Sequence, residues 1–350
     1  MVLTRRATKA LKSITRWLPA EMLLEMCGYV SDSTLASLCR TGRTMRALAT
    51  PVLYRSVSLT DGRRATRFIE AVASRPALAA HVRRLLLKRD KEDVDLSRPT
   101  TQTLNRILPL MTRLEDLDLR CVDFWLEGGI GGVCFRDLRS FGGLAIPESC
   151  ASMEAFLHRH STITTLDVMG CWENEVGTSA VHLPQLAAYT GSANFLSFLD
   201  DATVRRILSL DLCALDANFG AVLSRLAPCA HLRRVAGTLV DVEAAEVMEA
   251  VRKYVPQIQH IALRAQVPTE LPLAGVAERL GTLPLLRQLE FRRYTHASKA
   301  AGTVRTCGAA CEALLQVVLD DQEWRRVGGQ WVTWPPEGDG ELGSTSCLRA

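Results

Sequence analysis

The residue types most often used for chemistry, cysteine and histidine, are not spaced here as catalytic or metal-binding motifs. The 11 cysteines include no C-x-x-C pair, and the closest two, Cys307 and Cys311, lack a second pair at zinc-binding spacing. His158 and His160 also have no partner motif. We therefore expect structural roles for these side chains, no metal, no cofactor, and a reducing compartment, which means the cytoplasm, the nucleus or both.

No enzyme motif is found among the 350 residues. The sequence has no Gly-x-Ser-x-Gly, no His-Glu-x-x-His, no Walker loop and no Gly-x-Gly-x-x-Gly at a strand-to-helix turn. The glycine run at 127–134 lacks the Gly-Lys-Ser/Thr of a phosphate-binding loop, so we interpret it as a turn. A cysteine nucleophile would need a nearby histidine, which sequence alone does not place. We expect no catalytic site.

Charge and hydropathy argue against a membrane or nucleic-acid partner. The longest uncharged stretch, 176–199, contains proline, histidine and several amides and hydroxyls, and would be a poor membrane helix. Residues 1–60 contain nine basic and three acidic residues, whereas the rest of the chain is slightly acidic. The basic residues of 1–17 have no aromatic platform for bases beside them. We predict that 1–17 form a basic flexible tail.

Leucine supplies 51 of the 350 residues, and many leucines recur in the pattern L-x-x-L-x-L. This pattern is typical of the strand segment of a leucine-rich repeat. The clearest copies have these three anchor residues: Val82, Leu85, Leu87; Leu114, Leu117, Leu119; Ile163, Leu166, Val168; Ile207, Leu210, Leu212; Ile258, Ile261, Leu263; Leu286, Leu289, Phe291; Leu314, Val317, Leu319.

Weaker copies with two anchors each fill the gaps: Leu138 and Phe141, Leu183 and Leu186, Leu232 and Val235. Apart from the first step of 32 residues, successive first anchors are 20 to 28 residues apart, inside the range of this repeat class. The long first step contains a mixed-charge insertion at 88–99, which we predict to be a surface loop. The sequence therefore predicts about ten degenerate repeats over 60–334.

The anchor spacing also predicts which side chains are buried. The second and third anchors are two residues apart, so in a strand both point into the core and the residue between them faces outward. Helical periodicity appears between strands, at 152–160, 219–227, 242–254 and 273–281. We expect an α/β fold in which a solenoid carries short parallel strands on its concave face and helices on its convex face.

Residues 18–59 predict a separate module of three short amphipathic helices. Pro19 begins the first helix, and Met22, Met26 and Val30 line one of its faces. The apolar faces of the other two helices are formed by Leu35, Leu38 and Cys39, and by Met45, Leu48 and Ala49. A module of about 40 residues buries little apolar surface alone, so it must pack on the repeats or on another protein.

This module resembles an F-box. The resemblance lies in Leu18-Pro19-x-Glu21-Met22-Leu23-x-x-Met26, in Leu35-x-x-Leu38, and in the closing Leu48-Ala49-x-Pro51-x-Leu53-Tyr54-Arg55-Ser56-Val57. The segment CEALLQVVLDDQEW, with Trp331 beyond it, is similar to the last repeat of the F-box proteins with leucine-rich repeats that are abundant in fungi.

The resemblance implies a non-catalytic adaptor of an SCF-type (Skp-cullin-F-box) ubiquitin ligase. Such an adaptor binds the Skp subunit, and through it the cullin, with its F-box, and binds the protein to be ubiquitinated with its repeats. By this resemblance the Skp contact or its supporting core is formed by Leu18, Pro19, Leu23, Met26, Val30, Leu35, Leu38 and Leu48.

The outward-facing strand positions suggest where the substrate would bind. The residue between the second and third anchors is acidic in four strands, and arginines flank this row. We hypothesise that the row binds a basic patch of the substrate, although L-D-L is also a common solvated strand sequence. The candidate residues are Asp118, Arg120, Asp167, Asp211, Arg264, Glu290 and Arg292.

The predicted organisation is a basic flexible tail at 1–17, an F-box at 18–59, leucine-rich repeats at 60–334 and a disordered tail at 335–350. One alternative remains open. Residues 18–59 could simply cap the repeats of a protein-binding scaffold that has no connection with ubiquitin transfer.

Overall fold

The computed structural model describes residues 18–87, 97–120, 132–144, 150–169, 180–227, 231–271, 273–294 and 300–334. The chain divides into two compact units, 1–163 and 164–350. Both predicted tails, and most of the glycine run and of the charged insertion, lie outside the described residues. The end of that insertion was predicted wrongly as loop, because Arg98 and Pro99 already belong to a helix.

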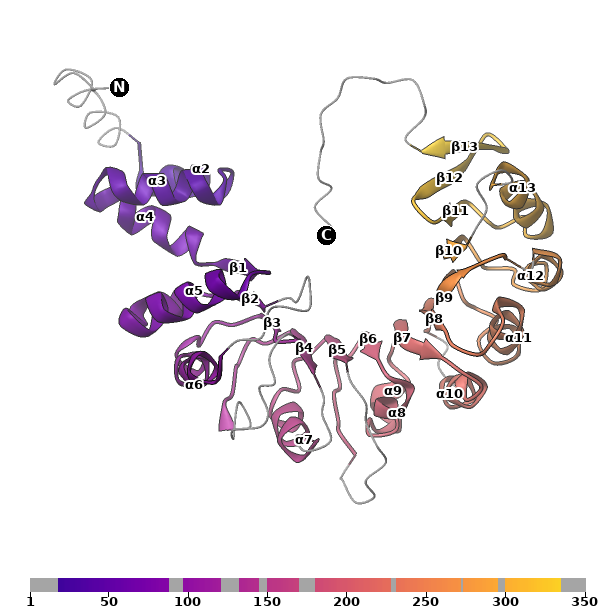
Figure 1. Ribbon diagram of the computed structural model, residues 1–350, viewed down its shortest axis with the longest axis horizontal. Coiled ribbons are helices and arrows are strands. Elements are labelled where there is room, and N and C mark those ends of the chain that lie inside the picture. The colour runs from indigo at the N-terminus through magenta and orange to yellow at the C-terminus, as the bar shows by residue number, and fades with distance from the viewer. Residues whose placement is uncertain are drawn as a thin grey trace. The chain divides into compact units, whose positions relative to one another are not determined.

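The first unit begins with three helices and continues with parallel strands and further helices, and strand order follows chain order (Figure 1). Its strands are β1 (Ser56–Leu59), β2 (Arg84–Leu87), β3 (Asp116–Asp118) and β4 (Ser140–Leu144). Its helices are α2 (Ala20–Gly28), α3 (Asp32–Thr41), α4 (Arg43–Leu53), α5 (Gly62–Ser74), α6 (Arg98–Ile107) and α7 (Cys150–Arg159), with short 3-10 turns η1 (Pro76–His81) and η2 (Leu108–Leu110).

The second unit continues the alternation of strand and helix. Its strands are β5 (Thr165–Met169), β6 (Ala188–Gly191), β7 (Ser209–Leu215), β8 (Arg234–Leu239), β9 (His260–Thr269), β10 (Gln288–Tyr294), β11 (Gln316–Leu319), β12 (Gln322–Val327) and β13 (Gln330–Trp334). Its helices are α8 (Ala193–Leu196), α9 (Asp201–Val204), α10 (Phe219–Leu226), α11 (Ala244–Tyr254), α12 (Leu273–Leu280) and α13 (Ala300–Ala310).

The strands from β5 to β11 are parallel, as predicted for the repeats, but the unit ends in an antiparallel arrangement that the sequence pattern does not predict. Strand β12 pairs antiparallel with β11, and β13 pairs antiparallel with β12. Gly328 and Gly329 form the turn between them with positive φ angles of 57° and 82°, a conformation that favours glycine. The mixed α/β class is confirmed, with mostly parallel strands.

Successive side chains of a strand point to opposite faces of the sheet, which explains why the anchors are buried together and the residues between them lie on the other face. In β7, Leu210 and Leu212 are fully buried while Asp211 between them is half-buried on the other face. The second anchors of the second unit lie side by side in register, each at most 1% exposed: Leu166, Tyr189, Leu210, Val235, Ile261, Leu289 and Val317. These side chains form one continuous apolar layer within that unit.

One anchor assignment was wrong. The sequence pattern assigned Leu183 and Leu186 as the first two anchors of a weak copy, but the strand begins later, and Tyr189 pairs with Leu166 and Leu210. Leu186 is therefore the first anchor and Tyr189 the second. The pattern search failed because the second anchor is a tyrosine, whose hydroxyl reaches the backbone oxygen of Ser192 at 2.7 Å.

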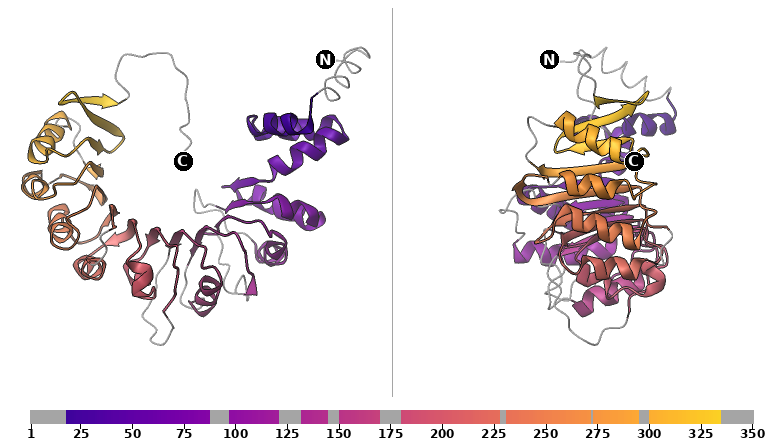
Figure 2. Two further views of the ribbon diagram at one scale, coloured as in Figure 1. Left: turned by 180° about the vertical axis from the view of Figure 1, so that it is seen from behind. Right: turned by 90° about the vertical axis from the view of Figure 1, so that its right-hand side faces the viewer.

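The four helices predicted between strands correspond to α7, α10, α11 and α12 and are confirmed to within one or two residues at most ends. Helix α11 begins with a capping box, in which Glu243 and Glu246 each bind the backbone N–H of the other. Its apolar residues Val247, Met248 and Val251 are buried. In Figure 1 and in the left-hand view of Figure 2, α10 to α13 lie along one side of the strands of the second unit.

His160 is structural, as expected, and 1% exposed. It stands three residues before the first anchor Ile163, a position occupied elsewhere by apolar residues such as Leu183 and Cys311. Its Nε2 accepts the backbone N–H of Phe135 at 2.8 Å, and its Nδ1 donates to the carbonyl oxygen of Phe156 at 2.7 Å. Burial lowers the pKa of His160, so the neutral ring is favoured.

None of the helices in the described part of the chain is both long and apolar enough to cross a membrane.

Candidate partner-binding surfaces

Three helices form the module predicted at the start of the chain. Helices α2, α3 and α4 pack around Cys27, Leu35 and Ala49, which are each at most 2% exposed. Ser31 caps α3, since its hydroxyl oxygen accepts the backbone N–H of Thr34 at 3.4 Å. The predicted range 18–59 extends further than this module, because its last four residues form strand β1.

Helix α2 has two apolar faces, and only one of them is covered. Leu23 and Cys27 face the module core, with exposures of 8% and 2%. Met22 and Met26 lie four residues apart along the other face and are 50% and 56% exposed. Val30, which the sequence placed on the same helix face, lies two residues beyond the end of α2 and is 36% exposed. We call Met22 and Met26 the α2 apolar face.

Two more large apolar side chains of this region are exposed. Leu24 is 43% exposed and Tyr29 is 82% exposed. Leu24 also lines a hollow of about 560 Å³ in the first unit, together with Pro51 and Val52. Exposed apolar side chains gathered in this way on one short helix and directly after it mark a surface suited to another protein.

The eight residues predicted for the Skp contact or its core fall into three groups. Leu23 and Leu35 are buried, Leu18, Leu38 and Leu48 are half-buried, and Pro19, Met26 and Val30 are exposed. Sequence reasoning named Met22 as part of a helix face but did not select it, and it missed Leu24 and Tyr29. Two overlapping i, i+4 series, one containing Leu23 and Cys27 and the other Met22 and Met26, were the available signal.

The second candidate surface is the outward face of the strands, described unit by unit. In the second unit the row between the anchors runs in register through Asp167, Thr190, Asp211, Ala236, Ala262, Glu290 and Val318. In the first unit the corresponding row is Ser58, Leu86, Asp118 and Gly142.

In the first unit, the predicted residues Asp118 and Arg120 bind each other. Nε of Arg120 donates to one oxygen of Asp118 at 2.9 Å and its Nη2 donates to the other at 2.6 Å, a two-pronged contact. Asp118 is 7% exposed and lies against Gly142, where a Cβ atom would stand 3.1 Å from the carboxylate. This carboxylate is held by its own chain.

In the second unit the carboxylates of Asp211 and Glu290 also have basic neighbours. Arg234 lies 3.6 Å from Asp211, and His260 lies 3.8 Å from Glu290, which also pairs with Arg292. His260 and Arg292 lower the pKa of Glu290 to about 2. Two of the acidic side chains proposed for substrate binding are therefore engaged within the unit.

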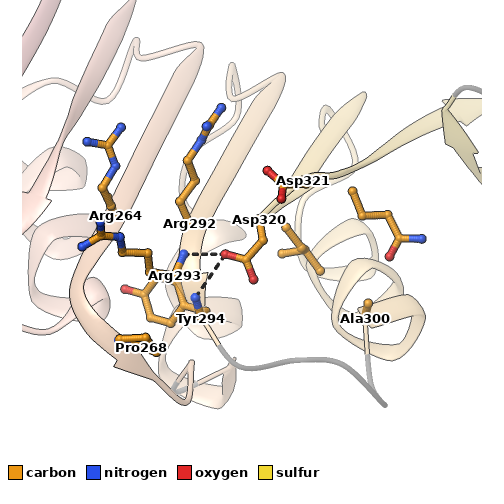
Figure 3. A pocket seen from close by; sticks show the side chains of 10 residues that line it. Arg264, Pro268, Arg292, Arg293, Tyr294, Ala300, Asp320 and Asp321 are labelled. Carbon is orange, nitrogen blue, oxygen red and sulfur yellow. Dashed lines mark hydrogen bonds between the residues drawn. The ribbon is translucent and has the colours of Figure 1, made fainter. Parts of the chain in front are cut away.

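Hollows lined by arginine side chains lie on and beside this face of the second unit. Ala236 and Ala262 are small and leave a shallow hollow, whose lining includes Arg234, Arg264 and Arg292. A larger hollow of about 770 Å³ lies where β9, β10 and β11 end, and Figure 3 shows the side chains that line it. We call this larger one the arginine hollow; its lining includes Arg264, Arg292, Arg293, Tyr294, Asp320 and Asp321.

Within the described ranges, no group of three or more His, Cys, Asp or Glu side chains is arranged to hold a metal ion. The surfaces offer apolar and charged contacts. No protein-family model and no curated protein matches this chain.

Proposed function

We propose that this chain is a non-catalytic substrate-recognition adaptor of an SCF-type ubiquitin ligase. In this proposal residues 18–53 are the helical part of an F-box that binds a Skp-type subunit, and leucine-rich repeats bind the protein to be ubiquitinated. The adaptor raises the concentration of the substrate near the transferring enzyme, and no side chain of the chain reacts. It would act in the cytoplasm, the nucleus or both.

The observation that carries the proposal is the α2 apolar face. Met22 and Met26 are at least half exposed although α2 already packs its other face on α3 and α4. A helix that served only to cap the repeats would need one apolar face. A second one costs solubility unless a partner covers it, and Met side chains adapt well to a partner surface.

The repeated strands support the second half of the proposal. Anchors two residues apart point to the core in every strand from β5 to β11 except where Gly191 and Gly237 replace the third anchor. The intervening residues are left on the outward face, where they vary from acidic to small and apolar. Repeat proteins bind partners through such variable outward positions.

Co-expression with a Skp-type subunit tests the proposal. We expect a stable heterodimer with the unaltered chain, and loss of that heterodimer for Met22→Asp with Met26→Asp, because two charges would be buried unpaired at the contact. Leu18→Ala with Pro19→Ala should weaken it. The matched control is Val267→Asp in the second unit, where the side chain is 66% exposed and the complex should persist.

The alternative function, a scaffold whose first helices are only a cap, predicts the opposite result. The chain would then fail to bind the Skp-type subunit, and the double Asp variant would behave like the unaltered chain. Circular dichroism of each variant shows whether its helices remain folded, so that loss of binding is not confused with unfolding.

A further inference from the structure

We propose that the arginine hollow of the second unit binds an acidic segment of a partner protein. The proposal rests on the substrate-receptor function above and names the chemistry of the substrate. It reverses the charge expected from the acidic strand row, which would select a basic segment. The two hypotheses therefore make opposite predictions for the same surface.

The first argument is the pairing of like charges. Arg264 on β9 and Arg292 on β10 are partners in the parallel register, and both side chains are exposed. Figure 3 shows them projecting from neighbouring strands to the same side. Like charges on adjacent strands destabilise a sheet, and an anion between them removes that repulsion.

The second argument is the availability of these guanidinium groups. The guanidinium group of Arg264 makes no hydrogen bond or ion pair with any residue that the structure describes. Arg292 is paired with Glu290, which orients it, while Arg293 donates from its Nη1 to the carbonyl oxygen of Gln266 at 3.1 Å and keeps its charge. A guanidinium held by one contact retains donors for a second acceptor.

The third argument is the backbone conformation of two residues that line the arginine hollow. Arg293 and Asp320 both have positive φ angles, 61° and 53°, which non-glycine residues adopt at a cost. The carboxylate of Asp320 accepts the backbone N–H groups of Arg293 and Tyr294, drawn as dashed lines in Figure 3. One carboxylate oxygen of Asp320 is thus occupied by backbone donors of its own chain.

The hollow is positively charged near Arg264 and negatively charged near Asp321, and this difference would orient a ligand. Asp321 is exposed on the turn between β11 and β12, and in Figure 3 it lies on the far side of Arg292 from Arg264. Pro268, Tyr294 and Leu319 supply apolar side chains to the lining. An extended segment fits with an Asp or Glu at the arginine end and an uncharged or basic residue at the Asp321 end.

Fluorescence anisotropy tests the inference with three labelled nine-residue peptides bearing Glu, Gln or Lys at alternate positions. We expect the Glu peptide to bind best, and to bind about tenfold more weakly to Arg264→Glu, because one charge-assisted contact is lost and a repulsion added. Asp321→Asn should tighten binding. Arg305→Glu, an equal charge change on α13, should leave it unaltered.

Three results would overturn the inference: preference for the Lys peptide, equal weakening by Arg264→Glu and Arg305→Glu, or tighter binding of a random duplex DNA than of the Glu peptide. Skp co-purification of the Arg264→Glu chain is measured in parallel. If the heterodimer forms but the Glu peptide does not bind, only this inference fails. If the heterodimer never forms while the peptide binds, the ligase function fails instead.

Discussion

The helices at the start of the chain and the strands of the second unit place large apolar side chains in opposite environments. Leu210 and Leu289 in the strands are completely buried, whereas Met22 and Met26 on α2 are at least half exposed. A strand has a neighbour on each side and helices against one face, while α2 touches its module through one face only. Buried side chains of this kind stabilise the fold, and exposed ones are free to bind a partner.

Truncation of one residue from each region is the strongest test of that contrast. Leu210→Ala should lower the free energy of unfolding by about 2–5 kcal/mol, because it leaves a cavity in a fully packed layer. Met26→Ala should change it by less than about 0.5 kcal/mol. Urea unfolding followed by circular dichroism measures both, and equal losses would show that the α2 apolar face is covered in the isolated chain.

A polar residue in the buried set gives the next largest effect. His160→Phe should cost about 2 kcal/mol near pH 7.5, because the N–H of Phe135 and the carbonyl of Phe156 lose their partner. The folded pKa of His160 is below its ordinary value, so the unaltered protein loses stability as pH falls below about 6.5. Unfolding curves at several pH values should show a shallower acid slope for the variant.

A smaller effect is expected where the last hairpin covers a helix. A Cβ atom on Gly308 of α13 would overlap the indole ring of Trp331 on β13. Gly308→Ala should therefore shift β13 and cost about 1–2 kcal/mol despite the better helix propensity of alanine. Gly302→Ala on the same helix meets nothing within 4 Å and is the control. Tryptophan fluorescence during unfolding distinguishes them.

The smallest effect concerns the outward strand face. The folded pKa of Glu290 is lowered to about 2, so its pairing stabilises the protein above about pH 4.5 and is lost as pH falls toward 2. Glu290→Gln should remove that part of the acid dependence, about 1 kcal/mol after screening by solvent. If stability depends on pH in the same way in the variant and the unaltered protein, the contacts of Glu290 with His260 and Arg292 do not stabilise the fold.

Much of the fold could be predicted from the spacing of apolar residues, because burying one face of a strand or helix requires apolar side chains at regular intervals. The pair Leu289 and Phe291 shows both anchors buried as predicted, and helix α11 lies within one or two residues of its predicted bounds. The shift at Leu186 and Tyr189 arose because an aromatic residue can take an anchor position. The antiparallel hairpin of β12 and β13 was missed because a single pair of glycines does not specify which strand it will pair with.

The candidate surfaces were predicted less well, for a physical reason. Spacing alone cannot tell a helix face that packs from one that stays exposed, so Leu23 and Met26 were assigned to the same contact. Nor can it show that Asp211 and Glu290 have basic partners, because Arg234 and His260 are far from them in sequence and adjacent only through strand pairing.

By itself, then, the sequence of this chain determined the alternation of strands and helices and the identity of most buried anchors, because both depend on the local period of apolar residues. Only the tertiary structure decided which apolar residues stay exposed on α2 and where Arg264 meets Arg292. Those outcomes depend on contacts between segments far apart in the chain, which no local pattern encodes.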